Sequence, residues 1–302
     1  MIAGFRLFSI LLLAVLTQSA QAQQAYPSAD AAAEALVVAL GSEKGDAERL
    51  AALLGADWQS YIPTGDVERE DVDAFLGLYR EKHMIEPTAA GRAALVVGNT
   101  PWTFPLPLVQ GKAGWTFDAK AGGEEIRVRR IGRNELASVE AVLAYHDAQM
   151  DYAEVDRDGD GVLEYAQQFM SSDGQYDGLY WPEQPGIEES PLGPLFGDEL
   201  PDGEWQGYHY RILTAQGASA PGGAYDYRLG DNMTRGFALI AWPAEYADSG
   251  VMSFMISHEG QVFEKDLGPD GAQLATSMGR FDPDRSWHEV AAEAEVEALA
   301  TP

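Results

Sequence analysis

Three aspartates at alternate positions form the strongest chemical signal in the sequence. Asp156, Asp158 and Asp160 are followed by Gly161 in the run DRDGDG at 156–161. The run matches positions 1, 3, 5 and 6 of an EF-hand loop, where carboxylate oxygens converge on the ion and the glycine permits a sharp turn. Oxygen ligands suit hard cations such as calcium. The run therefore predicts a structural calcium site, and calcium is the one cofactor that we expect.

The rest of the loop departs from an EF-hand. Position 12 is Gln167 where a bidentate glutamate is expected, and no second helix is evident after it. Glu164, Asp173 or Asp177 would have to complete the ligand sphere, so the affinity should be modest. The alternative interpretation is a solvated acidic turn without an ion. The predicted metal ligands are Asp156, Asp158, Asp160, Val162 and Glu164.

Aromatic side chains of the C-terminal half form a second candidate site. Such rings line ligand clefts and stack on sugars, but they also supply much of the buried area in proteins with short strands. The sequence leaves both interpretations open. The residues that would line such a cleft are Tyr180, Trp181, Tyr210, Tyr225, Tyr227 and Trp242.

The sequence shows no catalytic motif. The segment GASAP at 217–221 lacks the final glycine of a nucleophile elbow. HExxH, Walker and dinucleotide-binding patterns do not occur, and the five histidines are scattered along the chain. We predict no catalytic residue.

Local patterns in the N-terminal half predict helices followed by strands. Helices are indicated from Ser28 to Gly41, over 45–54, and from Asp66 to Pro87, with a short strand at 58–62. Alternation and turn residues then predict strands over 93–97, 103–109 and 114–118. Helices on a small curved antiparallel sheet resemble the cystatin-like fold in outline.

A long helix is expected to lead into the acidic loop. Apolar residues recur at helical spacing from Gly122 to Met150, with an irregularity expected at Gly132. Four arginines lie near its start, and pairing with nearby glutamates or an anion site would each explain them. Strands are predicted over 208–214, 236–242, 251–257 and 261–265, the last two as a hairpin around 258–260. The fold class is α+β.

The N-terminal segment and the composition indicate an exported protein. Residues 1–22 read as a signal peptide with cleavage after Ala22, and an uncleaved anchor is the alternative. The chain has no cysteine, and its formal net charge of −28 argues against a nucleic-acid partner. We expect an N-terminal α+β domain at 28–120, a C-terminal domain at 121–290, a flexible acidic tail at 291–302, and no integral membrane segment after cleavage.

Several strings in the C-terminal half are similar to one bacterial family. They are RIGRNEL (130–136), DGLYWP (177–182), SPLGPL (190–195), YRILTAQG (210–217), GGAYDY (222–227), GFALIAWP (236–243) and FEKDLG (263–268). The chain resembles the domain-of-unknown-function family DUF2950. The resemblance implies an exported or envelope protein and supplies no catalytic residues. The C-terminal half is also faintly similar to the globular domains of pilins and major pseudopilins.

The sequence thus favours a non-enzymatic periplasmic or secreted protein that acts through interaction or assembly at the cell envelope with a protein partner. The alternative is a periplasmic hydrolase or sugar-active enzyme that uses the aromatic and acidic loops. The two hypotheses differ in what the acidic residues should do. An interaction protein predicts that the Asp156 loop lies away from any cleft and that calcium raises thermal stability. An enzyme predicts a concave pocket that gathers carboxylates with perturbed ionisation, some of them outside that loop.

Overall fold

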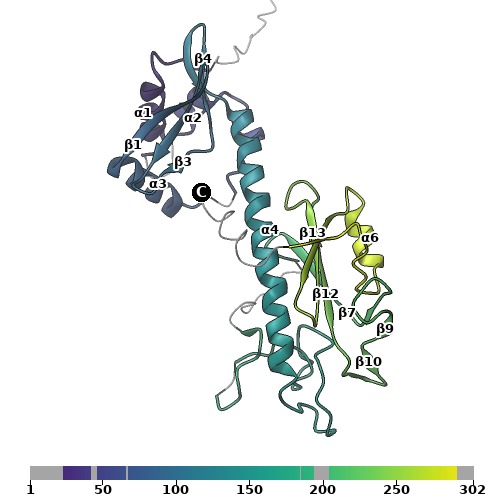
Figure 1. Cartoon of the computed structure of the whole chain (residues 1–302). Coiled ribbons are helices and arrows are strands. Elements are labelled where there is room, and N and C mark those ends of the chain that lie inside the picture. Colours follow the sequence, from purple (N-terminus) through teal and green to yellow (C-terminus); the bar gives the residue numbers. More distant parts are fainter. Residues whose placement is uncertain (1–22, 42–45, 66, 184, 194–203, 291–302) are drawn as a thin grey trace, which may run out of the picture. The chain divides into compact units, whose positions relative to one another are not determined.

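The computed structural model describes residues 23–41, 46–65, 67–183, 185–193 and 204–290 (Figure 1). The expected signal peptide at 1–22 and acidic tail at 291–302 lie outside these residues. The chain divides into two units, residues 1–124 and residues 125–302, and each is described by itself.

Capping residues set the helix starts of unit 1. The hydroxyl of Ser28 accepts a hydrogen bond from the Ala31 N–H, and the carboxylate of Asp46 accepts one from the Arg49 N–H, both at 3.1 Å. These bonds satisfy backbone donors that have no partner inside a helix. The three predicted helices are present, although their end points differ from those expected. Unit 1 contains α1 (Ala29–Leu40), α2 (Ala47–Leu54), a 3₁₀ turn (Trp58–Ser60) and α3 (Arg69–Glu81).

Two expectations for the segment 58–87 were wrong. The segment 58–62 is a 3₁₀ turn and not a strand, because the Tyr61 and Ile62 N–H groups bond to the nearby carbonyl of Trp58 at 3.0 Å. The third helix ends at Glu81 and does not reach Pro87, which lies in strand β1. A proline without an N–H is tolerated in a strand at the edge of a sheet.

The sheet of unit 1 is antiparallel and follows the order β1-β2-β4-β5, with β3 paired to β2. The segment predicted as one strand over 103–109 is broken into β3 and β4, with Pro105 and Pro107 in the break. Leu36, Leu76 and Leu95 are among the fully buried side chains of its core. The strands are β1 (His83–Ala89), β2 (Arg92–Val97), β3 (Trp102–Thr103), β4 (Leu108–Gly111) and β5 (Gly114–Phe117).

The long helix is α4 (Ala119–Tyr152), which begins after Asp118, whose carboxylate accepts a hydrogen bond from the Ala121 N–H at 3.0 Å. The irregularity expected at Gly132 is absent, since the helix is continuous through this exposed residue. One glycine costs a helix only about 1 kcal/mol relative to alanine. Contacts on both sides of Gly132 outweigh that cost.

Unit 2 is built on an antiparallel sheet in the order β15-β14-β13-β12-β7-β6. The four predicted strands are present, and the expected hairpin closes with the Gly260 N–H bonded to the Ser257 carbonyl at 2.9 Å. Two small ladders, β8-β9 and β10-β11, and the helix α6 (Gly271–Ser277) complete the unit. The large sheet contains β6 (Glu204–Trp205), β7 (Tyr208–Leu213), β12 (Ala238–Pro243), β13 (Met252–Ser257), β14 (Val262–Asp266) and β15 (His288–Glu289). The ladders contain β8 (Ala215–Gln216), β9 (Tyr225–Asp226), β10 (Arg228–Leu229) and β11 (Asn232–Met233).

The core of unit 2 lies between α4 and the large sheet, and α6 lies on the other side of that sheet (Figure 1). Val142 and Tyr145 of α4 belong to one buried cluster with Phe254 and Ile256 of β13. The Tyr145 hydroxyl donates to the carbonyl of Ala238 at 3.3 Å. The mixed α+β class is confirmed. Among the described residues, no helix combines the length and the apolar character that crossing a membrane requires.

Candidate functional site

The acidic loop follows the end of α4 and folds around its first aspartate. The two carboxylate oxygens of Asp156 accept hydrogen bonds from the N–H groups of Gly159 and Gly161, at 2.8 and 2.9 Å. Both glycines have positive φ, 77° and 89°, which other residues rarely adopt. This turn gathers Asp156, Asp158 and Asp160 so that one carboxylate oxygen of each lies within 4.8 Å of the others. An exposed all-oxygen cluster of this kind could hold a metal ion.

The carboxyl groups of the loop influence one another. Hydrogen bonds from the Gly161 and Gly159 N–H groups hold the pKa of Asp156 below its ordinary value. Burial raises the pKa of Glu164, against the hydrogen bond from the Met233 N–H, and the negative charge of Asp158 adds to the rise. A bound cation would relieve this repulsion between carboxylates.

The structure separates the remaining candidate ligands. Val162 adjoins the cluster, and its N–H donates to the carboxylate of Asp160 at 2.7 Å. Glu164 is tied to β11, because its carboxylate accepts from the Met233 N–H at 3.1 Å. Asp177 is bound elsewhere, with hydrogen bonds from the backbone and the hydroxyl of Ser172 at 2.7 and 2.8 Å. Of the described residues, the three aspartates alone form a group with metal-ligand spacing.

Distant residues that the sequence did not indicate hold the loop. The Asn232 side-chain amide donates to the carboxylate of Asp160 at 2.6 Å, across 72 positions of sequence. The Tyr165 N–H donates to the Met233 carbonyl at 2.9 Å. Just after the acidic loop, the side chain of the buried Gln149 of α4 accepts from the Ala166 N–H at 2.9 Å and donates to the Ala166 carbonyl at 2.8 Å. No local sequence pattern marks these partners, because their roles depend on the tertiary fold.

A cavity of about 250 Å³ opens beside the acidic loop. Asp158 and Glu164 contribute to its wall, together with tyrosine rings and glutamine side chains from 165–176. The acidic loop therefore adjoins a polar cavity in the same unit, so the expectation that this loop lies away from any cleft was wrong; Asp177, outside the loop, lines the same cavity.

Most of the aromatic residues predicted to line a cleft belong to the core. Tyr180, Trp181, Tyr227 and Trp242 are all buried. The Tyr227 hydroxyl donates to the side chain of Gln216 at 3.1 Å, and the Trp181 indole N–H donates to the carbonyl of Glu188 at 2.9 Å. Tyr210 and Tyr225 are partly buried and pack against the same core. None of the six lines the cavity beside the acidic loop.

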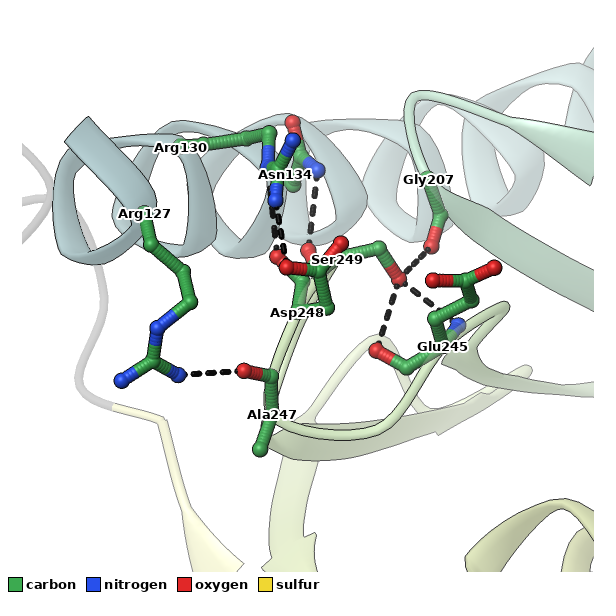
Figure 2. Close-up of polar contacts among 8 residues, drawn as sticks. All are labelled: Arg127, Arg130, Asn134, Gly207, Glu245, Ala247, Asp248 and Ser249. Carbon is green, nitrogen blue, oxygen red and sulfur yellow. Dashed lines mark hydrogen bonds and ion pairs between the residues drawn. The ribbon is translucent and has the colours of Figure 1, made fainter. Parts of the chain in front are cut away.

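The arginine cluster of α4 holds the loop that precedes β13 (Figure 2). Arg127 donates to the Ala247 carbonyl, Arg130 pairs with the carboxylate of Asp248 at 2.5 Å, and Asn134 donates to the Ser249 carbonyl at 2.8 Å. Glu135 of the same helix also contributes, because its carboxylate accepts hydrogen bonds from the N–H groups of Val251 and Met252.

Pairing within the helix, as expected from the sequence, occurs between Arg129 and Glu125 at 2.8 Å. The other contacts of the cluster reach across the unit, and they account for much of the string RIGRNEL. Arg127 and Arg130 of the cluster therefore bind a protein loop.

Comparison with known proteins identifies a family. No curated protein and no solved structure matches the chain. The family described as "Protein of unknown function (DUF2950)" matches residues 23–290, which cover nearly all of the described chain. The chain therefore belongs to the DUF2950 family.

Proposed function

We propose that this chain is a non-enzymatic, exported protein of the cell envelope that acts through interaction or assembly, and that its acidic loop holds a structural calcium ion. The observation that carries the calcium site is the convergence of the Asp156, Asp158 and Asp160 carboxylates at the end of α4. Carboxylate oxygens suit calcium, which accepts six to eight oxygen ligands in flexible geometry. Val162, beside Asp160, and Glu164 would complete the ligand set, with Glu164 using the carboxylate oxygen that is not bonded to the Met233 N–H.

A calcium ion in this loop would strengthen a junction between distant parts of unit 2. Asp160 is bonded to Asn232, and Glu164 is bonded to the backbone of Met233. Calcium on the aspartates would therefore stabilise the connection between the end of α4 and the ladder β10-β11. Its role would be structural, since the cluster lies at the surface with no histidine or cysteine in it.

The placement of the aromatic residues supports a non-enzymatic role. Four of the six candidate rings are buried in the core of unit 2, and so they are unavailable to stack on a substrate. An enzyme built on these rings would need them exposed in a cleft. The interaction role rests on this placement and on the strongly acidic, cysteine-free composition.

Thermal melting tests the calcium site. At a dissociation constant of about 10⁻⁴ M, 1 mM calcium would add about 1.4 kcal/mol of stability, or a rise of about 3–6 °C in melting temperature. Chelator should remove the rise, and Asp158→Ala should abolish it. The matched control is Asp151→Ala, which removes an exposed aspartate of α4 outside the cluster and should keep the response. An intact protein whose melting temperature ignores calcium would contradict the site.

Export is tested separately. The chain is produced in a bacterial host with a C-terminal tag, and the periplasmic fraction is sequenced from the N-terminus. We expect the mature chain to begin at Gln23, after cleavage behind Ala22. Recovery of the full-length chain from the cytoplasm alone would contradict export.

A further inference from the structure

The cavity beside the acidic loop has the size and lining of a site for a small polar molecule. Its volume of about 250 Å³ is below the roughly 300–1,000 Å³ typical of pockets for drug-sized ligands, so it suits a ligand with a single ring. Its wall comes from the end of α4 and from the segment 157–177, all within unit 2.

Two tyrosine rings in the wall are held rigidly and stay partly exposed. Tyr176 packs edge-on against the buried Trp181, with ring centroids 5.1 Å apart. Tyr165 packs edge-on against the buried Phe237 at 4.8 Å. Rings fixed in this way offer a flat apolar surface with little loss of conformational entropy when a ligand binds.

Amide and carboxylate groups stand beside these rings. The side chain of Gln175 is exposed and makes no hydrogen bond with any residue in the described part of the chain. Gln168 donates to the Ser172 hydroxyl at 3.3 Å, a long bond that leaves its carbonyl oxygen available. Asp177 contributes a carboxylate that hydrogen bonds from Ser172 fix in place. Glutamine both donates and accepts, whereas a carboxylate accepts only.

The charges of the wall argue against an anionic ligand. Asp158, Glu164 and Asp177 outnumber the single cation Arg157, so the cavity repels anions. The guanidinium of Arg157 lies over the rings of Tyr152 and Trp181, at 5.1 and 5.0 Å, and places one positive charge in the same wall.

We propose that this cavity binds a neutral saccharide unit, which stacks on Tyr176 or Tyr165 and bonds through its hydroxyl groups to Gln168, Gln175 and Asp177. Vicinal hydroxyls donate and accept, as the amides and the carboxylate beside the rings require. The site goes beyond the proposed calcium loop, since neither glutamine belongs to the predicted metal ligands. It would make the protein a carbohydrate-binding partner.

A glycan array followed by calorimetry tests the site. The intact mature protein is applied to an array of neutral, N-acetylated and acidic saccharides, and the strongest hit is titrated as the free sugar. We expect a neutral saccharide to bind. The double variant Gln168→Ala/Gln175→Ala should weaken binding at least about fivefold, because two hydrogen bonds are lost. The matched control Gln273→Ala, on the exposed side of α6, should leave binding unchanged.

Melting curves establish that each variant is folded, and Gln175→Ala alone serves if the double variant is not. Absence of binding to every saccharide, equal binding by the double variant, or binding of 1,4-diaminobutane in place of sugars would each overturn the proposal. Titrations in calcium and in chelator keep the two sites apart. Sugar binding that persists in chelator leaves the cavity supported even if calcium fails to raise the melting temperature.

Discussion

Removing the Gln149 side chain should destabilise unit 2 far more than a typical polar substitution. Gln149 is fully buried, accepts from the Ala166 N–H and donates to the Ala166 carbonyl and to the Tyr145 hydroxyl. Gln149→Ala would leave the N–H and the carbonyl of Ala166 buried without partners, at a cost of about 1–3 kcal/mol each. The expected loss is therefore about 2–6 kcal/mol, out of the roughly 5–15 kcal/mol that stabilise a domain.

Hydrogen exchange at the Ala166 amide measures this effect directly and does not assume that both units unfold together. A loss of about 3 kcal/mol corresponds to exchange roughly 150-fold faster, with a lower denaturant midpoint for unit 2. Gln273→Ala, an exposed glutamine of α6, is the matched control and should change neither. A loss below about 1 kcal/mol with unchanged Ala166 exchange would refute the reasoning, because it would mean that the buried groups find other partners.

Gln149→Glu adds a pH test of the same site. The glutamate keeps an acceptor for the Ala166 N–H and loses the donor when ionised. Burial disfavours the ionised form, so the pKa of the new carboxyl should lie above the unfolded value of about 4.3. The folded variant then binds more protons than the unfolded chain, and its stability falls as pH rises through that interval. If Gln149→Glu lowered the free energy of unfolding by the same amount at pH 4 and at pH 7, a buried position of the new carboxyl would be contradicted.

Two further predictions concern a glycine turn and a buried phenol. Gly207 and Gly223 both have positive φ, 75° and 76°. A Cβ added at Gly207 would lie 2.5 Å from the side-chain amide nitrogen of Asn134, whereas a Cβ added at Gly223 would have no atom within 4 Å. Gly207→Ala should therefore cost at least about 1 kcal/mol more than Gly223→Ala in chemical denaturation, and equal costs would contradict the contact. Burial raises the pKa of Tyr152 to about 12, so the folded protein keeps this proton as pH rises above about 10 and loses stability from there towards 12. Tyr152→Phe lacks the hydroxyl that donates to the Tyr176 carbonyl at 2.9 Å, so it should be less stable than the natural protein at neutral pH. The difference in stability should shrink over pH 10–12, and a difference that stays constant would contradict the raised pKa of Tyr152.

The elements that sequence patterns predict best depend on contacts within a few residues. Ser28 caps α1 through a group three positions away, and Gly159 and Gly161 bend the acidic loop around Asp156. Such features follow from capping and turn chemistry alone. Trp58 shows the limit, because an aromatic residue with strand propensity lies in a turn whose hydrogen bonds are all local.

The candidate site was predictable only in part, because its supports are distant in sequence. The three aspartates converge as their spacing indicates, but Asn232 lies near Asp160 only through the tertiary fold, which places the ladder β10-β11 beside the loop. The role of the aromatic residues was ambiguous for a different reason. Composition cannot tell an aromatic ring of the core from one that lines a cleft, and only the tertiary fold shows that Trp181 is buried.

Pro87 has a consequence for the behaviour of the protein at high concentration. It lies in β1, which is the edge of its sheet and is largely exposed along its length. An open edge invites pairing with a strand from another molecule, which is how ordered aggregates begin. Pro87 presents no N–H to such a strand, and the bulge between Pro87 and Ala89 breaks the register that a second chain would have to follow. The residue whose type suggested the end of a helix thus protects the sheet against uncontrolled growth.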